Sequence, residues 1–370
     1  MKRLLPVVVV LLTSCGVAHH AATRSPIPSG SVVASATPSA SPGSVTASVS
    51  PGTELTGQLP VISAADNAVG NFQNAGGFLQ LRGGAFTLDP AARMVADAAR
   101  HAWRTQATPQ LFGTSDSGRG RITYDGAAGR WFPVSASQVT PDGMHYAYVE
   151  AIMPAATGSQ PGPGPIATGE RIHVVDVRTA SDTVVFNHSG DPYFTIVGVG
   201  QQVVYLSAAC VEGCSPDSLK LWRLDPTTGV LTKLSDRKGF NWQISEPYAW
   251  VGTYGESTPR LLRIDLRTGQ ADAWLTAPDL DFLGLDHVGL PLVTLNDDQR
   301  SLLLSVRAPA QTVQLFSGPS NGEFTVAIAD RTATWIGGGQ SGDEGIYVYT
   351  GGSALRKLST FAGLPVGPLS

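Results

Sequence analysis

The chain of 370 residues carries 25 Lys and Arg against 29 Asp and Glu, which gives a formal net charge of −4. Charged residues make up only 15% of the sequence and no basic stripe is present, which argues against a nucleic-acid partner. The 42 glycines and 26 prolines are typical of many short strands joined by tight turns, and the length is normal for a closed all-β repeat structure.

Residues 1–15 have the pattern of a secretion signal. Lys2 and Arg3 precede an apolar run that is too short to span a membrane stably and that ends at Cys15 after small residues. The Leu-Thr-Ser-Cys ending resembles the lipobox of bacterial lipoproteins. This resemblance implies that Cys15 receives a diacylglyceryl group, whose two acyl chains hold the mature protein on the outer face of the cell membrane. The alternative is an ordinary signal peptide, cleaved at the weak small-residue motif in 17–22.

Residues 16–60 consist mostly of Ser, Ala, Thr, Pro, Gly and Val. Such a segment cannot bury enough apolar surface to offset its ordering entropy, so we expect a disordered linker that tethers a globular domain over residues 61–370. At roughly 5–6 Å × √n, the linker has an average reach of about 35–40 Å.

A helical pattern stands at the start of the globular domain. Asp89 and Pro90 have the types of an N-cap and a first helical residue, and apolar residues from Met94 to Trp103 recur at helical spacing. We therefore expect one short helix there, which either packs on the neighbouring strands or acts as a lid.

Six later segments share one pattern, in which two apolar-alternating runs flank a short polar turn, and this predicts six β-hairpins. The hairpins cover residues 121–134, 172–186, 221–234, 261–275, 301–316 and 345–358. Further strand-like runs lie between them, at 194–199, 202–206 and 324–329. A repeat of about forty to fifty residues with four strands per unit is typical of propeller blades.

Two motifs carry a resemblance to known propellers. The Thr-Pro-Asp-Gly-x-x-x-Ala-Tyr run at 140–148 is similar to the Ser-Pro-Asp-Gly motif of TolB-like and WD-repeat-like bacterial propellers, and the run at 221–229 looks like their outer hairpins. The resemblance covers most of 76–362 and implies a propeller fold. Taking it together with the six hairpins and the helical pattern, we expect an all-β fold, a six-bladed β-propeller with the short helix inserted in the first blade. A seventh, degenerate blade between 86 and 120 is the alternative. The run at 77–81 either starts the first blade or completes the last one.

Two cysteines remain within the globular domain, Cys210 and Cys214. Outside the cytoplasm, a close pair of this kind predicts a disulfide bond that shapes a protruding turn. The alternative is a metal site, but two thiols without a nearby histidine or further cysteine leave a zinc shell incomplete.

The mouth of the central channel is the expected binding site, because the loops that enter the inner strands converge there. In four of these loops an aromatic side chain accompanies a polar or acidic one, which suits a sugar, a peptide or a cation. The candidate ligand-binding residues are Asp191, Tyr193, Asn241, Trp242, Asp281, Phe282, Glu323 and Phe324. The alternative is that the aromatic residues pack between blades and the polar residues cap strand ends.

No catalytic residues are identified from the sequence. The histidines of the globular domain stand at no metal-binding interval from one another; they are His101, His145, His173, His188 and His287. We therefore expect no cofactor, and a monomeric, non-catalytic module that binds a protein or a cell-envelope glycan.

The alternative function is an extracytoplasmic lactonase, lyase or glycosidase that uses acidic residues at the channel mouth, where Ca²⁺ would also find oxygen ligands. Convergence of three or more carboxylates on one point would favour this function. The carboxylates concerned are Asp142, Asp191, Glu246, Asp281, Asp286, Glu323 and Asp330.

Overall fold

The computed structural model describes residues 55–63, 76–95, 122–152, 167–190, 192–209, 216–297, 299–319, 322–330, 332–340, 343–361 and 363–370. All of them belong to one compact unit, Thr53–Ser370. Antiparallel strands make up most of these ranges, and no helix within them is long and apolar enough to cross a membrane.

Four sheets each contain four strands that follow one another along the chain. The first comprises β9 (Phe194–Val199), β10 (Val204–Ala208), β11 (Leu221–Leu224) and β12 (Leu231–Ser235). The second comprises β13 (Gly239–Ser245), β14 (Tyr248–Thr253), β15 (Arg260–Asp265) and β16 (Ala271–Thr276). The third comprises β17 (Leu280–Leu285), β18 (Pro291–Asn296), β19 (Arg300–Ala308) and β20 (Gln311–Pro319). The fourth comprises β21 (Gly322–Ala329), β22 (Thr334–Gln340), β23 (Asp343–Tyr349) and β24 (Arg356–Ser359).

Three further sheets depart from this plan. One joins both ends of the described chain in the order β25-β1-β2-β3, with β1 (Gln58–Ser63), β2 (Gly76–Gln80), β3 (Phe86–Leu88) and β25 (Gly363–Pro365). A two-stranded sheet consists of β4 (Thr123–Asp125) and β5 (Arg130–Phe132). A three-stranded sheet consists of β6 (His145–Ile152), β7 (Gly169–Asp176) and β8 (Ser181–Ser189).

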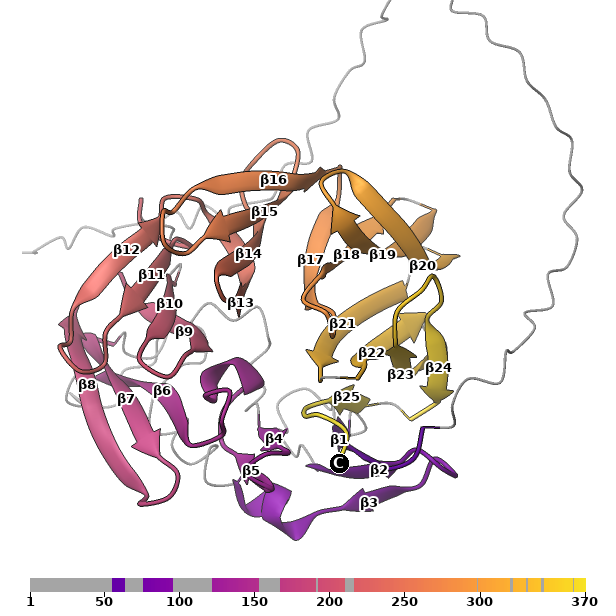
Figure 1. The fold of residues 1–370 in the computed structure, drawn as a ribbon, viewed down its shortest axis with the longest axis horizontal. Coiled ribbons are helices and arrows are strands. Elements are labelled where there is room, and N and C mark those ends of the chain that lie inside the picture. The colour runs from indigo at the N-terminus through magenta and orange to yellow at the C-terminus, as the bar shows by residue number, and fades with distance from the viewer. Residues whose placement is uncertain are drawn as a thin grey trace, which may run out of the picture. The chain divides into compact units, whose positions relative to one another are not determined.

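The sheets follow one another around a common centre, with β9, β13, β17, β21 and β25 innermost (Figure 1). Buried side chains of each sheet pack against those of the next. Phe194 of β9 packs with Ile172 of β7, and Phe282 of β17 packs with Trp250 of β14. The chain therefore folds as a β-propeller, whose core lies between neighbouring sheets.

The predicted all-β propeller is confirmed, and all six predicted hairpins form, as β4–β5, β7–β8, β11–β12, β15–β16, β19–β20 and β23–β24. The count of six blades stays a prediction, because the described residues form seven sheets, one of which has only two strands. The signal peptide and most of the predicted linker lie outside the described residues. The predicted boundary at residue 60 is a few residues late, because β1 begins at Gln58 and Leu59 is buried in the core.

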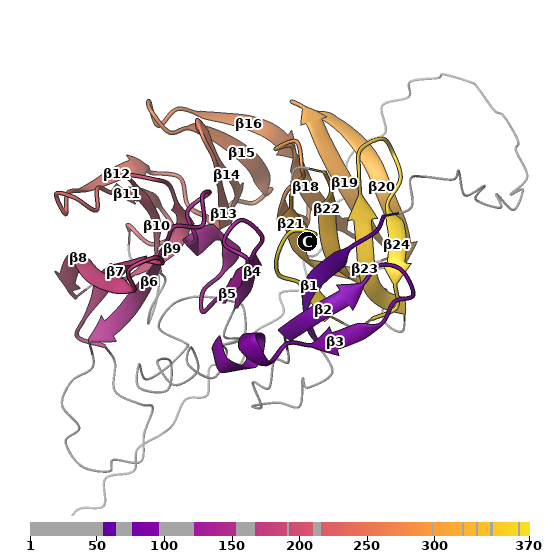
Figure 2. The ribbon, with the colours of Figure 1, turned by 60° about the horizontal axis from the view of Figure 1, so that its bottom comes forward.

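The ring is closed by the C-terminal end of the chain. Strand β25 pairs antiparallel with β1, with Val61 opposite Pro365 and Ser63 opposite Gly363. Two backbone hydrogen bonds between Gln58 and Ser370, of 2.9 and 3.0 Å, extend this pairing, and Figure 2 shows the C-terminal end beside β1. The predicted strand at 77–81 is β2, which belongs to this closing sheet.

Residues 90–95 form the start of the predicted helix, and the rest of it, through Trp103, lies outside the described residues. One oxygen of the Asp89 carboxylate accepts a hydrogen bond from the Ala91 N–H at 2.9 Å, and the other accepts one from Trp131 Nε1 at 2.8 Å. The same carboxylate thus caps the helix and fixes it to β5.

The three-stranded sheet has a short 3₁₀ helix, η2 (Ala136–Gln138), where the four-stranded sheets have an inner strand. Gln138 Nε2 donates to the carbonyl of Ala147 at 3.1 Å, and Val139 forms an isolated bridge with Tyr146. A side-chain amide therefore satisfies part of the inner edge of β6.

The two ends of the ring are different. Each inner strand starts at the connection from the preceding sheet and ends at a hairpin turn. Because neighbouring strands are antiparallel, the hairpin turns after the first and third strands of a sheet share one end of the ring, here called the turn face. The connections between sheets lie at the other end, here called the crossover face.

Aspartate-capped turns recur on the turn face. Asp225 and Asp265 each accept hydrogen bonds from two backbone N–H groups of their turns, and the glycines that follow, Gly229 and Gly269, both have a φ of 71°. A Cβ atom at Gly269 would lie 2.5 Å from the carbonyl oxygen of Leu234, so this turn requires glycine for space as well as for its backbone angle.

Candidate functional site

The aromatic members of the predicted channel mouth are buried between sheets. Tyr193, Trp242, Phe282 and Phe324 are between 3% and 7% exposed. The Tyr193 hydroxyl donates to the carbonyl of Ala167 at 2.5 Å, and Trp242 Nε1 donates to the carbonyl of Leu219 at 3.1 Å. Their polar atoms are therefore engaged within the fold, which is the arrangement that the packing alternative describes.

The polar members of the predicted mouth divide into two groups. Asn241 and Asp281 are exposed on the crossover face, at the starts of β13 and β17. Asp191 lies outside the described residues, as do Cys15, Cys210 and Cys214, and only the main chain of Glu323 is described. The ligand-binding role of this set stays a prediction.

Of the seven carboxylates of the enzyme alternative, the five whose side chains the structure describes do not meet at one point, while Asp191 and the Glu323 side chain lie outside the described residues. Asp281 stands at the start of β17, whereas Asp286 follows its end. At about 3.4 Å per residue, the two are separated by roughly 17 Å along the strand. Among the residues that the structure describes, no group of three or more His, Cys, Asp or Glu side chains is placed to hold a metal ion.

The carboxylates on the turn face are engaged in building it. Asp286 Oδ1 accepts hydrogen bonds from two N–H groups of its own turn, and Glu246 accepts one from the hydroxyl of Tyr205 in the preceding sheet at 2.8 Å. Asp330 Oδ2 accepts from Trp335 Nε1 at 2.7 Å and from the N–H of Leu369 at 3.2 Å. Burial opposes ionisation of Asp330, but these and the Thr332 hydrogen bonds hold its pKa below the ordinary value.

A Gly-x-Ser-x-Gly run occurs at residues 318–322, in the connection from β20 to β21. The nucleophile elbow of hydrolases requires a sharp turn from a strand into a helix, whereas this run joins two strands. Ser320 itself lies outside the described residues, so the run identifies no nucleophile.

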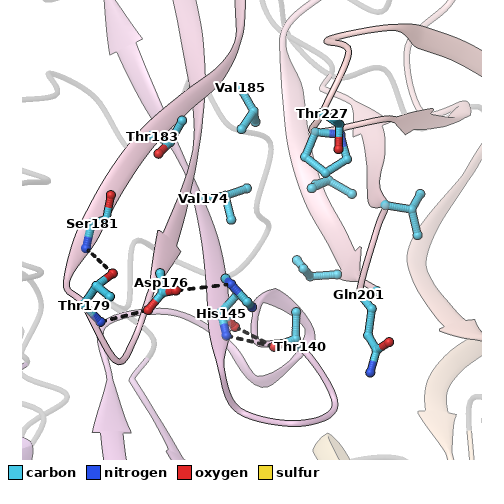
Figure 3. Close-up of a pocket in the computed structure, with 15 residues that line it drawn as sticks. Thr140, His145, Val174, Asp176, Thr179, Ser181, Thr183, Val185, Gln201 and Thr227 are labelled. Carbon is cyan, nitrogen blue, oxygen red and sulfur yellow. Dashed lines mark hydrogen bonds and ion pairs between the residues drawn. The ribbon is translucent and has the colours of Figure 1, made fainter.

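A groove of about 430 Å³ opens between the sheet of β6–β8 and the sheet of β9–β12. Its residues belong to the hairpin turns and the strand ends beside them, so the groove lies on the turn face, opposite the predicted mouth. One wall carries Ser181 and Thr183 of β8, and the other carries Gln201 and Thr227, as Figure 3 shows. Valines line the floor between the walls, from positions 174, 185, 199, 203 and 204.

Four polar side chains of the groove are free to bind a ligand. Within the described part of the chain, the side chains of Ser181, Thr183, Gln201 and Thr227 make no hydrogen bond. Ser181, Thr183 and Gln201 are also exposed to solvent. Hydroxyl and amide groups both donate and accept, so these walls are suited to an uncharged polar ligand above an apolar floor.

The two titratable side chains of the groove, His145 and Asp176, lie at one end and face each other. His145 Nε2 is 3.8 Å from Asp176 Oδ2, and the other Asp176 oxygen accepts hydrogen bonds from the N–H groups of Thr179 and Arg178. The hydrogen bond from the Thr179 N–H is the largest of several effects that lower the pKa of Asp176. Sequence reasoning missed this groove because its polar residues belong to turns that are separated by up to 87 positions in the chain.

At the crossover face, a buried carboxyl joins the same two sheets. Glu170 of β7 is fully buried, and both of its oxygens lie 3.0 Å from the N–H of Phe194, which donates to them. Burial raises the pKa of Glu170 to about 8, because its effect is larger than that of the Phe194 hydrogen bond, which lowers the pKa. One signal was present in the sequence, because Glu170 alternates with Ile172 and Val174 on what is otherwise an apolar strand face.

A polar network covers the other face of the three-stranded sheet. His173 Nδ1 is 2.9 Å from Asp182 and 3.1 Å from the Tyr148 hydroxyl, and its Nε2 is 3.1 Å from Glu150. Tyr148 stacks on His173, and its hydroxyl donates to Asp182 at 2.6 Å. Burial is the larger cause, and this hydrogen bond the next, of a raised pKa for Tyr148. The raised pKa makes Tyr148 a weaker acid than an ordinary tyrosine. Each side chain of the network is hydrogen-bonded to another, so the network holds β6, β7 and β8 together.

The comparisons with known proteins give no family. No protein-family model matches the chain, and no curated protein matches it. Similar solved structures include TolB from Acinetobacter baumannii, at 10% identity over 85% of this chain and 68% of that one, with a TM-score of 0.41. The β-propeller domain of the Trilobed protease from Pyrococcus furiosus is 10% identical over 59% of this chain and 68% of its own, with a TM-score of 0.42.

An oligogalacturonate lyase from Vibrio parahaemolyticus is 12% identical over 57% of this chain, with a TM-score of 0.41. This chain covers 63% of that lyase, which is less than two thirds of its length. At these identities and scores the matches say nothing about activity, and the strand order above carries the fold assignment.

The raised pKa of Glu170 predicts a pH dependence of stability. The folded-state pKa of Glu170, about 8, exceeds its ordinary value of 4.5, so its contribution to stability is fully present below pH 4.5 and is lost as the pH rises toward 8. The loss is at most about 1.4 kcal/mol per pH unit. In denaturant titrations between pH 4.5 and 8, the free energy of unfolding of the wild type should fall relative to that of Glu170→Gln, which does not titrate. A constant difference between the two proteins across this range would contradict the assignment.

Proposed function

We propose that this chain is an extracytoplasmic, lipid-anchored propeller that binds an extended, uncharged segment of a cell-envelope protein in the groove between β6–β8 and β9–β12. The observation that carries the proposal is the set of unbonded polar side chains, Ser181, Thr183, Gln201 and Thr227, around a floor of valines. An extended peptide offers the same alternation of polar main-chain groups and side chains.

The lining of the groove disfavours an anionic ligand. It contains no lysine or arginine, and its titratable side chains are Asp176 and His145, whose Oδ2 and Nε2 atoms lie 3.8 Å apart. An anionic ligand would leave water without a lysine or arginine to pair with, which costs more than burying a neutral group.

Binding is favoured over catalysis by the way the polar groups are used. The described carboxylates on the turn face hold turns and neighbouring sheets, and those of the His173 network hold strands. The groove itself offers hydroxyl and amide groups, which orient ligands, beside a single histidine. An extracytoplasmic enzyme remains the competing function, and turnover of a lactone or an oligosaccharide by the purified chain would support it.

The anchor belongs to the same proposal and rests on the sequence. Cys15 ends a signal of the lipoprotein type, and residues 16–57, which precede β1, have the composition of a flexible tether. This arrangement would hold the propeller at the outer face of the membrane, within reach of envelope proteins.

Filling the groove should abolish binding. In Thr183→Lys a long charged side chain enters the groove from its β8 wall, and we expect at least tenfold weaker retention of solubilised envelope proteins, about 1.4 kcal/mol or more. The full chain is immobilised, and the proteins that it retains are identified by mass spectrometry. The amounts retained by the wild type are compared with those retained by Thr183→Lys.

The matched control is Thr312→Lys, at an exposed threonine of the outer strand β20, which has nine residues like β8. It should retain the same proteins as the wild type. Equal retention by wild type and Thr183→Lys, with both folded, would rule out the groove as the binding site.

Loss of the lipidated thiol should release the protein. In a bacterial host that processes lipoproteins, the wild-type chain should fractionate with membranes, whereas Cys15→Ala should appear in the extracytoplasmic soluble fraction with an unchanged unfolding midpoint. A variant that stays with the membrane would show that something other than Cys15 holds the chain there.

A further inference from the structure

The crossover face carries an exposed aromatic pair that the groove does not use. Phe240 and Tyr254 are 41% and 48% exposed, and they are the two aromatic residues among the strongly exposed apolar side chains of the described chain. Their ring centroids are 4.5 Å apart in an edge-to-face arrangement, and the Tyr254 N–H donates to the carbonyl of Lys238 at 3.1 Å. We call Phe240 and Tyr254 the aromatic ledge.

An irregular backbone presents this ledge. The pairing of β13 with β14 shifts register between Phe240 and Gln243, so that two residues of β13 stand opposite Val251 alone. In a regular strand Phe240 and Asn241 would point to opposite faces, but here both are exposed. The φ of Asn241 is +58°, a conformation that costs a non-glycine residue free energy. The backbone is thus strained at Asn241, where the side chains of Phe240 and Asn241 are both exposed.

Polar groups flank the ledge on the side of the next sheet. Asn241 Nδ2 donates to the carbonyl of Phe282 at 3.3 Å, which fixes the amide and leaves its oxygen as an acceptor. Asp281, the residue before Phe282, is exposed, and partial burial of its carboxyl together with the charge of Asp279 raises its pKa.

The charged pair beside Tyr254 is internally neutralised. Arg260 donates to both oxygens of Glu256, at 2.7 and 2.5 Å, and Glu256 accepts a further hydrogen bond from Thr253. A bidentate pair of this kind is strongly held, so it offers little net charge to a ligand.

We propose that the aromatic ledge, with Asn241 and Asp281, is a second binding site, which takes a neutral saccharide. The C–H face of a sugar ring packs on an aromatic side chain, while its hydroxyls both donate and accept hydrogen bonds. Asp281 accepts from such hydroxyls and Asn241 Oδ1 does likewise. The ledge lies at the opposite end of the strands from the groove, so the two sites hold different ligands at the same time.

The test is calorimetric titration of the full chain with neutral hexasaccharides of glucose, galactose, mannose and N-acetylglucosamine. At least one should bind at millimolar or lower concentration, and Phe240→Ala and Tyr254→Ala should weaken it at least tenfold. The control is Val288→Ala, at a side chain that is 61% exposed in the β17–β18 turn on the opposite face, and it should bind as the wild type does.

A third variant separates binding from folding. Asn241→Gly relieves the strain of the positive φ, but it removes the hydrogen bond to Phe282 and gives the unfolded chain more freedom, so its unfolding midpoint should stay close to that of the wild type. Its affinity for the saccharide should nevertheless fall at least tenfold. The proposal is overturned if no hexasaccharide binds the wild type, or if the three ledge variants bind the saccharide as tightly as Val288→Ala does. Loss of saccharide binding in Thr183→Lys would place the sugar in the groove and also overturn it.

Discussion

Pairing of β25 with β1 is the interaction on which the rest of the structure depends. Each sheet buries apolar side chains against the sheet before it and the sheet after it, so an open ring would leave two such faces in water. The closing contact combines main-chain pairing with Leu59 and Val61, which pack against Trp335 of the neighbouring sheet. Asp330 adds a side-chain bond to Leu369 at the same junction. Residues more than 300 positions apart therefore fix the ring, and both candidate sites are features of its two ends.

The two ends of the ring are chemically different because of strand direction. On the turn face, tight hairpins need groups that satisfy their N–H donors, and aspartates such as Asp265 and Asp286 serve that purpose. A groove remains between β6–β8 and β9–β12 because the side chains that meet there, such as Thr183 and Val203, are too short to fill the space. At the crossover face of the same junction Glu170 binds Phe194 and closes the sheets together.

Sequence patterns predicted the repeating part of this fold and little of its site. Alternation of apolar residues identified all six hairpins, and Asp89-Pro90 identified the helix, because both signals depend on near neighbours in the chain. The role of β25 was hidden, because three residues that include Pro365 have no strand pattern of their own. The sequence did not mark Phe240 and Tyr254 as a binding site. Phe240 reaches the surface beside Tyr254 because of the register shift in β13, which no sequence pattern predicts. The groove depends on which turns become neighbours, and this is a consequence of ring closure.

The central claim is that a closed propeller presents the groove as a binding surface for an envelope protein. Hydrogen–deuterium exchange on the full chain, with and without solubilised envelope proteins, tests it most directly, because exchange reports each segment separately. The account predicts slower exchange in β8 and in the turns at 199–203 and 225–230 when the proteins are added, with little change in the outer strands β20 and β24. Unchanged exchange in β8 and in those turns, in a sample where envelope proteins are bound, would contradict it.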